Sequence, residues 1–356
     1  MTPRDRIRAT VNHRQPDRVP RTTPMAAETA DRLKKHLGVD SAGLAAWCGQ
    51  DLHYVGPGFR RSVSPMCYAD PTIEVTADGL YLDIYRVPFR PVQAGDQQYM
   101  ELAGRPPLAN CTSAADLARH PWPDADWWDY SNLAADIARL PDAALNSHSR
   151  GFFEISHFMR GGDLFLADLA GDPSFACAIM DRVIDYLLDR ARRILVAGAG
   201  RFDMFEYNDD VATQRGLFMS PTMWRQLFRP RIARFCDLIH SFGAKVRYHS
   251  CGSVRAIIPD LIDVGVDILN PIQPLAAGMD PFELKREFGQ HLTFDGGIDT
   301  QELLPHSTAD QVRTHTRRMI AEVGASGGYI LGPSHSLQMD VPVENIVAMI
   351  EEANGG

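Results

Sequence analysis

Short apolar runs alternate with longer amphipathic stretches from about residue 140 onward. The runs have the length of buried strands, and the stretches between them carry apolar residues at helical spacing. The predicted strands are residues 143–147, 201–207, 244–249, 266–270, 291–295 and 329–332. The predicted helices are residues 173–198, 221–242, 254–264, 280–288 and 309–323. This order of elements indicates a repeating β-α unit.

Two earlier segments, residues 18–25 and 51–55, could supply two further strands. Eight strands alternating with helices favour a (β/α)₈ TIM barrel over an open doubly wound sheet, with residues 1–356 as a single domain. The region from about 67 to 130 breaks the rhythm with strand-like runs and a tryptophan-rich stretch. We interpret it as an inserted, strand-rich segment that covers one end of the barrel.

Charge and cysteine content narrow the classes of partner and compartment. The chain has 356 residues, 45% of them hydrophobic, and 36 basic against 45 acidic residues give a formal charge of −9. Without a long basic run, this charge argues against a nucleic-acid surface. No apolar stretch has bilayer-spanning length and the N-terminus lacks a signal-peptide core, so we expect a cytoplasmic protein without a membrane partner. The six cysteines form no CxxC pair, which fits reduced thiols better than disulfides.

A histidine and a cysteine lie two residues apart at the end of the predicted strand 244–249. Residues i and i+2 of a strand project from the same face, so His249 and Cys251 could hold one zinc ion. A catalytic zinc usually has three protein ligands and one open position, and His335 is the candidate for the third. Glu154 is a candidate fourth ligand. The alternative is a set of ordinary hydrogen-bonded polar groups at a barrel mouth.

Polar residues follow most of the later predicted strands at the point where each strand ends. In a TIM barrel this end of the strands carries the catalytic side chains. The residues concerned are Asp209, Asp210, His249, Cys251, Asn270, Gln273, Asp295, Asp299 and His335. Because they come from different strands, their shared position favours an active site at this end of the barrel.

Several of these segments resemble the uroporphyrinogen decarboxylase superfamily, in particular its branch of cobalamin-linked methyltransferases. The motifs are YHSCGSV (248–254), GVDILNPIQ (265–273), GMD (278–280), GGIDTQ (296–301) and VPVEN (341–345). TPRDR (2–6) and PDRVP (16–20) are also typical, so the resemblance spans essentially the whole chain. As a set the motifs are specific for the superfamily and much less specific for one activity.

In the methyltransferase branch, a His-X-Cys motif and a distant cysteine together bind zinc. His249 and Cys251 match the first two, and ILGPSH (330–335) places His335 where those enzymes have the cysteine. The decarboxylases have an active-site histidine at that same position. The resemblance implies zinc in this chain and cobalamin carried by a separate corrinoid protein.

The decarboxylases also have an Arg-Gln-Ala-Gly-Arg-Tyr motif, whose guanidinium groups can pair with the carboxylates of a porphyrinogen. This chain has RTTPMAAE at residues 21–28 instead, so a tetra-acidic macrocycle is not the expected substrate. Asp51 matches the catalytic aspartate of the decarboxylases, and His157 matches their tyrosine. Decarboxylation of a smaller acidic molecule therefore stays open as an alternative.

The remaining catalytic candidates each have a structural alternative. Asp209 and Asp210 could orient a ligand histidine or act as general base, and helix capping before Ser220 would account for one of them. Glu154 and His157 are spaced i, i+3 on one helix face, where an ordinary buried polar pair is equally expected.

The resemblance also implies pocket positions for Asp299, as a catalytic candidate, and for Asn270, Gln273 and Gln301 as residues that bind cofactor or substrate. The stretch 51–56 fits the Asp-x-His-x-x-Gly pattern of corrinoid-binding proteins. That pattern belongs to a separate Rossmann-like domain, and the βαβ context is absent here. We therefore expect the corrinoid on a partner protein.

We hypothesise a zinc-dependent methyltransferase that moves a methyl group between a small molecule and the cobalt of a corrinoid protein. Zinc ionises a bound thiol and makes an ether oxygen a better leaving group. With His335 in place of a second thiolate the zinc complex would carry a net positive charge instead of none, which favours a methoxylated donor. The alternatives are a metal-free decarboxylase that uses Asp51 and His335, and a barrel that binds a small molecule or tetrapyrrole without catalysis.

Overall fold

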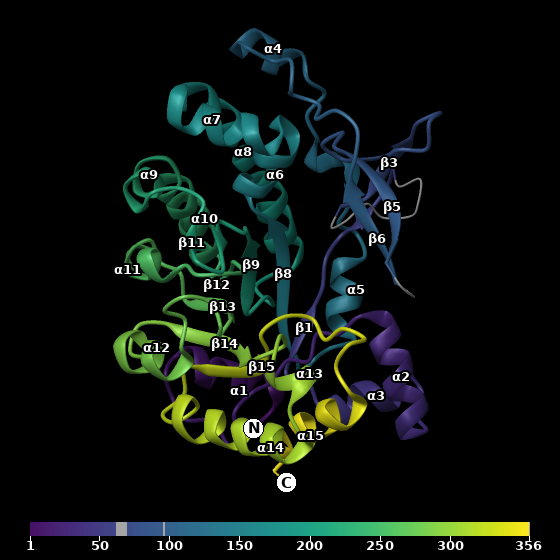
Figure 1. The fold of residues 1–356 in the computed structure, drawn as a ribbon, viewed down its shortest axis with the longest axis vertical. Helices are drawn as coiled ribbons and strands as arrows, with labels where there is room; N and C mark the ends of the chain where they lie inside the picture. The colour runs from purple at the N-terminus through teal and green to yellow at the C-terminus, as the bar shows by residue number, and fades with distance from the viewer. Residues whose placement is uncertain (62–69, 95–96, 356) are drawn as a thin grey trace.

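A curled parallel sheet forms the centre of the computed structural model, which describes residues 1–61, 70–94 and 97–355 (Figure 1). Its strand order is β1-β8-β9-β12-β13-β14-β15, and every neighbouring pair is parallel. The strands are β1 (Leu52–Tyr54), β8 (Ala144–Arg150), β9 (Met204–Asn208), β12 (Lys245–His249), β13 (Ile268–Ile272), β14 (Thr293–Ile298) and β15 (Tyr329–Pro333). All seven coincide with predicted strands.

The eighth predicted strand, residues 18–25, forms two isolated bridges instead, Arg21 with Leu331 and Met25 with Leu337. The backbone N–H of Asp51 donates to the carbonyl of Arg21 at 3.1 Å, so this segment runs between β15 and the start of β1. Pro20 and Pro24 accept hydrogen bonds here but have no N–H to donate, which keeps the segment from forming a continuous ladder.

Helices surround the sheet and connect its strands (Figure 1). They are α1 (Pro3–Val11), α2 (Ala27–Leu37), α3 (Ser41–Cys48), α4 (Ala114–Arg119), α5 (Leu133–Ala138), α6 (Phe152–Arg160), α7 (Gly162–Gly171), α8 (Pro173–Ala197), α9 (Pro221–Leu227), α10 (Arg229–Ser241), α11 (Ile258–Asp263), α12 (Pro281–Phe288), α13 (Leu303–His306), α14 (Ala309–Arg318) and α15 (Val343–Ala353). There are also two 3₁₀ helices, η1 (Ala125–Trp127) and η2 (Arg255–Ile257), and a π-helical segment, η3 (Met319–Val323), that continues α14. The predicted helix 221–242 is divided at Phe228, because Pro230 occupies the first turn of α10. None of the described helices is long and apolar enough to cross a membrane.

The region 67–130 contains a four-stranded antiparallel sheet in the order β3-β4-β5-β6. Its strands are β3 (Thr72–Val75), β4 (Tyr81–Asp83), β5 (Pro88–Ala94) and β6 (Gln97–Leu102). Two small antiparallel pairs are β2 (Gly58–Phe59) with β7 (Trp128–Asp129), and β10 (Ala212–Thr213) with β11 (Gly216–Leu217). In Figure 1 the four-stranded sheet lies beyond the upper part of β8, apart from the central sheet. The first part of the expected insertion, with Cys67, lies outside the described residues.

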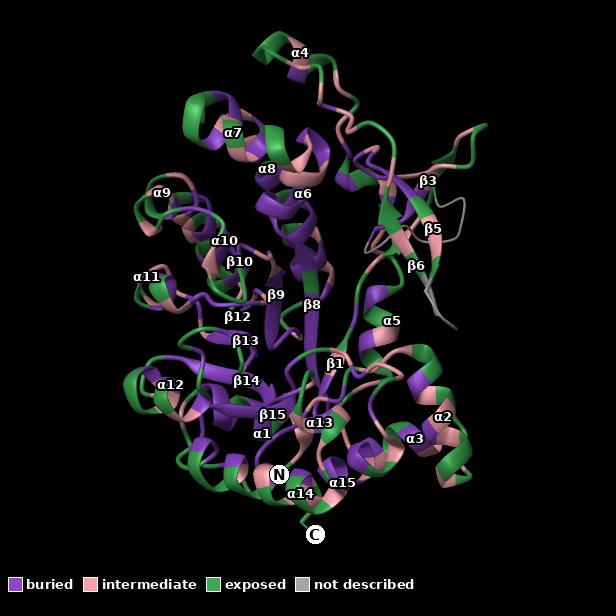
Figure 2. Cartoon of the chain, viewed as in Figure 1, coloured by how far each residue is buried: buried purple, intermediate pink, exposed green. Residues whose placement is uncertain are grey.

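The interior of the curled sheet changes from apolar to polar along the strands. At their N-terminal ends one buried cluster is formed by Leu52, Ala144, Met204, Ile268 and Ile330 together with Ile7 and Val11 of α1. Residues two positions further along a strand share the same face. Several of these are polar, namely Tyr54, Asn146, Glu206 and Asn270. Figure 2 shows the strands buried along most of their length and the outer helices exposed on one side. The polar C-terminal end of the strands is therefore the part of the interior that has side chains capable of catalysis or ligand binding.

Candidate functional site

A buried ion pair network forms the floor of the cavity at the C-terminal ends of the strands. Arg247 of β12 pairs with Glu206 of β9, and its Nε donates to Asp295 of β14 at 2.8 Å. The hydroxyl of Tyr54 donates to Glu206 Oε2 at 2.6 Å. Burial alone would raise the pKa of the Glu206 carboxyl, but Arg247, His249 and the hydrogen bond from Tyr54 together outweigh burial and lower this pKa to about 2. The floor therefore holds a fixed anion beside a fixed cation.

His249 lies directly above this floor. Its Nδ1 donates to Asn270 Oδ1 at 2.7 Å, while Asn270 Nδ2 donates to the carbonyl of Asp295 at 3.5 Å. The Nε2 atom of His249 is left with its lone pair. It lies 3.8 Å from Cys251 Sγ and 3.9 Å from Asp210 Oδ1.

The side chains of Asp210, His249 and Cys251 form a group with metal-ligand geometry. One ligand atom from each residue lies within 4.8 Å of the other two, and all three residues are half-buried. Asp210 Oδ1 also accepts the backbone N–H of Cys251 at 2.8 Å, which holds the loop after β12 against the loop after β9. Nitrogen, sulfur and carboxylate oxygen are the donors that zinc takes, and three of them leave a fourth position open. The residues present therefore fit a zinc ion.

Gln273 supports the cysteine end of this group. Its Oε1 accepts the backbone N–H of Gly252 at 2.7 Å and the side-chain amide of Gln214 at 2.8 Å. Gly252 has a positive φ of 86°, and a Cβ there would lie 2.5 Å from the carbonyl oxygen of Thr213. Burial raises the pKa of the Cys251 thiol to about 12, with Asp210 adding to the effect. Gln273 is thus a residue that shapes the loop of Cys251.

The two other predicted ligands lie outside the three-residue group. His335 is exposed and lines the same cavity as His249, a space of about 180 Å³ whose walls also include Thr22 and Asn270. Glu154 is buried and pairs with Arg150 at 3.2 Å. Asp210 reaches His249 because β9 and β12 are adjacent, whereas His335 follows β15 at the far edge of the sheet. Ligation by His335 or Glu154 stays a prediction.

Asp209 and Asp299 both cap helices. Asp209 is fully buried and accepts the backbone N–H groups of Phe153 at 3.1 Å and Glu154 at 2.8 Å, in the first turn of α6. Burial raises the pKa of its carboxyl to about 7. Asp299 accepts three backbone N–H groups ahead of and within α13, at 2.7 to 3.2 Å. These bonds are helix caps, although Asp209 caps α6 and not the helix after Ser220 that the sequence suggests.

Asp51 lies at the opposite end of the parallel strands from His249. Its carboxylate is fully buried, pairs with Arg6 at 2.6 Å and Arg18 at 2.8 Å, and accepts the N–H of Arg21 at 3.0 Å. It precedes the first residue of β1, at the N-terminal end of the strands. This position fits a structural ion pair and separates Asp51 from the candidate site.

His157 and Gln301 are also away from the metal group. The ring of His157 stacks on Phe153 with the centroids 5.6 Å apart, and burial lowers the pKa of its imidazole. Gln301 is exposed, and its backbone N–H is one of the three that Asp299 accepts. The floor residues Tyr54, Glu206 and Arg247 were not predicted. A charged residue within an apolar strand, such as Arg247 between Val246 and Tyr248, is the signal that would have found them.

A solved structure similar to the whole chain is a methyltransferase from Methanosarcina mazei. The two share a TM-score of 0.66 at 16% sequence identity, and the comparison covers 100% of this chain and 99% of that one. At this identity the likeness shows the fold.

Sequence comparisons point to the same group of proteins. Two proteins described as methylcobamide:CoM methyltransferase MtaA, from Methanosarcina barkeri and from its strain Fusaro, are 28% and 26% identical over 161 residues. The matched segment is 45% of this chain and spans only 43% of the length of those relatives. A sequence model of the family described as uroporphyrinogen decarboxylase (URO-D) matches residues 138–355, so the motifs at 2–6 and 16–20 lie outside the match. Because that match covers more than half of the chain, the protein belongs to the uroporphyrinogen decarboxylase family.

Proposed function

We propose that this protein is a zinc-dependent methyltransferase that moves a methyl group between a small molecule and a corrinoid protein. The observation that carries the proposal is the group of Asp210, His249 and Cys251 at the polar end of the barrel. The methylcobamide methyltransferase relatives support it, as does the hydrogen bond that fixes the tautomer of His249.

Zinc held by these three residues would lower the pKa of a bound thiol, or polarise a bound oxygen, so that a methyl group can be transferred. The chain itself supplies the rest of the site. Asn270 orients His249, Gln273 shapes the loop of Cys251, and the Arg247–Glu206 pair closes the floor. The cavity of about 180 Å³ suits a small molecule.

Asp210 as a ligand changes the charge argument for the methyl donor. Two anionic ligands, Asp210 and a Cys251 thiolate, would balance the charge of zinc, as two thiolates do. The positive complex expected with His335 is then not formed, so a preference for a methoxylated donor no longer follows from charge. The chemical class of the methyl donor is therefore to be determined by measuring turnover with several candidate donors.

The decarboxylase alternative requires Asp51 and His335 to act on one substrate. Asp51 lies at the N-terminal end of β1 and is neutralised by Arg6 and Arg18, whereas His335 follows β15 at the other end of the strands. This separation favours the methyltransferase over that decarboxylase. The other alternative, a protein that binds a small molecule without catalysis, would bind its ligand but show no turnover.

The test is a methyl-transfer assay with the full chain, added zinc, and free cobalamin as a stand-in for the corrinoid protein. Candidate donors are a methoxylated aromatic compound, methanol and a methylamine with cob(I)alamin, and the candidate acceptor is a thiol with methylcobalamin. With one of these compounds we expect the cobalamin absorbance to change as its cobalt gains or loses a methyl group. Cys251→Ser should show no such absorbance change. If the zinc-bound protein turns over none of these compounds, the proposal is contradicted. Equal turnover by Cys251→Ser and wild type would contradict it as well.

A further inference from the structure

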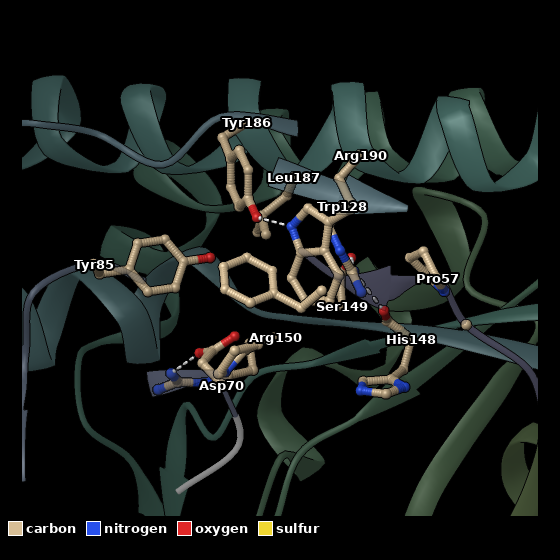
Figure 3. Close-up of a pocket in the computed structure, with 13 residues that line it drawn as sticks. Pro57, Asp70, Tyr85, Trp128, His148, Ser149, Arg150, Tyr186, Leu187 and Arg190 are labelled. Carbon is tan, nitrogen blue, oxygen red and sulfur yellow. Dashed lines mark hydrogen bonds and ion pairs between the residues drawn. The ribbon is translucent and has the colours of Figure 1, made fainter. Parts of the chain in front are cut away.

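A second cavity lies beside the barrel, between β8, α8 and the strand-rich region that ends at β7 (Figure 3). Its volume is about 270 Å³, near the lower end of the range of about 300–1,000 Å³ common for small-molecule sites. It shares no lining residue with the cavity at His249. The two are separated by Tyr54 and His148, whose rings meet edge to face with centroids 6.0 Å apart.

Aromatic side chains held by mutual contacts form the walls of this second cavity. The indole N–H of Trp128 donates to the hydroxyl of Tyr186 at 2.8 Å. The Tyr85 and Tyr186 rings pack edge to face at 5.9 Å, and those of Phe59 and Trp128 at 5.0 Å. Such walls present flat apolar surfaces in fixed positions, which suits a flat ring.

Arg190 places a positive charge without a carboxylate partner at one end of the cavity. The side chain is 8% exposed, and its guanidinium lies 4.1 Å from the centroid of the Trp128 ring. Its Nη1 donates to the carbonyl of His148 at 2.9 Å. Within the described part of the chain its hydrogen-bond partners are the His148 carbonyl and the Ser149 hydroxyl, with no carboxylate among them, and its Nε is buried without a hydrogen bond. Because a buried cation is costly unless it is paired, this end of the cavity favours an anion.

The other end of the cavity is rich in carboxylates. Arg150 there contacts Asp70, Glu154 and, at 3.9 Å, Asp83. Burial and the neighbouring Asp70 raise the pKa of the Asp83 carboxyl, so three carboxyl groups surround a single guanidinium here. The hydroxyl of Tyr85, a residue 2% exposed, points into the cavity from this side in Figure 3 and makes no hydrogen bond to another described residue. This end therefore favours a neutral group that can donate a hydrogen bond.

We propose that this cavity binds a small aromatic carboxylate with a hydroxyl group on the opposite side of its ring. The carboxylate pairs with Arg190, the ring lies among Phe59, Trp128 and Tyr186, and the hydroxyl faces Asp70 and Tyr85. The site depends on neither zinc nor the proposed methyl transfer, since its residues are separate from Asp210, His249 and Cys251.

Isothermal titration calorimetry with three probes tests the proposal on the wild-type chain. 4-Hydroxybenzoate is the expected ligand, 4-hydroxybenzyl alcohol lacks its charge, and benzoate lacks its hydroxyl. We expect one molecule of 4-hydroxybenzoate per chain and affinity for the alcohol lower by about tenfold or more. Equal affinity for the alcohol, or no binding of 4-hydroxybenzoate, would overturn the proposal.

Substitutions of residues in and near this cavity test whether the ligand binds there. Arg190→Met should lower the affinity for 4-hydroxybenzoate about tenfold or more, whereas Arg193→Met should not. Arg193 is the matched control, because it lies one turn further along α8, is half-buried, and is paired with Asp189 at 3.0 Å. If Arg190→Met does not fold, Tyr85→Phe replaces it, with weaker binding of 4-hydroxybenzoate and unchanged binding of benzoate expected. Loss of binding in Cys251→Ser would place the ligand at the other cavity and refute the proposal.

Discussion

His249 and Asn270 lie opposite each other on the neighbouring strands β12 and β13, and the imidazole Nδ1 donates to the amide oxygen at 2.7 Å. The amide oxygen can only accept, so the ring proton is on Nδ1 and the lone pair on Nε2. That lone pair faces Cys251 and Asp210. A ligand histidine is commonly held in this way by a neighbour that does not touch the metal.

Replacing the partner of His249 should therefore weaken metal binding. Asn270→Ala is expected to lower zinc affinity by about 10- to 100-fold, because the ring loses its fixed orientation. Asn270→Asp can still accept from Nδ1 and should retain most of the affinity. Competition with a chromophoric chelator measures both constants. Equal affinity in Asn270→Ala and wild type would show that the hydrogen bond has no part in metal binding.

Substitutions at the adjacent residues Asp209 and Asp210 should have different effects, the first mainly on stability and the second mainly on metal binding. Asp209→Ala removes the side chain that accepts the N–H groups of Phe153 and Glu154, and should reduce the free energy of unfolding by about 1–2 kcal/mol or more. Asp210→Ala removes one acceptor, for the N–H of Cys251, so it should cost the metal-free protein about 1 kcal/mol or less and lower the zinc content. Urea unfolding with chelator present, combined with elemental analysis, makes the comparison. Loss of zinc in Asp209→Ala, together with the larger loss of stability in Asp210→Ala, would contradict the prediction.

Glu206 should stabilise the curled sheet in a pH-dependent way. Its folded-state pKa of about 2 lies below the ordinary value of 4.5, so its contribution is present above about pH 4.5 and lost as the pH falls toward 2. Glu206→Gln leaves Arg247 buried with one carboxylate and is expected to cost about 3–5 kcal/mol at neutral pH. Its stability should also fall less steeply in acid. Glu322→Gln, in an exposed pair with Arg318, is the control and should change stability by under about 1 kcal/mol. Parallel acid dependence of Glu206→Gln and wild type would refute this role.

Asp51 should matter for folding and not for turnover. Asp51→Asn weakens the pairing with Arg6 and Arg18 at the N-terminal end of β1, and a loss of about 3–5 kcal/mol is expected. Methyl transfer per folded molecule should stay within about twofold of wild type. Thermal unfolding and turnover normalised to the folded fraction test this. A stable Asp51→Asn protein without turnover would restore the catalytic role that the family motif assigns to this residue.

The strands could be predicted because a parallel sheet buries both faces, and each strand then reads as a short apolar run between helices. The exception is the segment at 18–25, where Pro20 and Pro24 limit pairing to isolated bridges. The four-stranded sheet was expected only as strand-rich, although each of its strands pairs with the next strand along the chain.

The candidate site was predictable where local spacing decides geometry. His249 and Cys251 share a strand face through the i, i+2 rule. The place of Asp210 beside them depends on the pairing of β9 with β12 and on a loop hydrogen bond to Cys251, which local spacing does not reveal. Asp51 shows the opposite case, because its motif matches but its two arginine partners come from α1 and from the segment between α1 and α2.

Zinc content of Asp210→Ala and His335→Ala, purified without a metal-affinity tag and measured by elemental mass spectrometry, tests the central claim most directly. The structure predicts about one zinc per chain in wild type and in His335→Ala, and a large loss in Asp210→Ala, with Cys251→Ser as the positive control for loss. Zinc that is retained in Asp210→Ala and lost in His335→Ala would show that the ligand set is His249, Cys251 and His335. No zinc in the wild-type protein under replete conditions would contradict the metal centre itself.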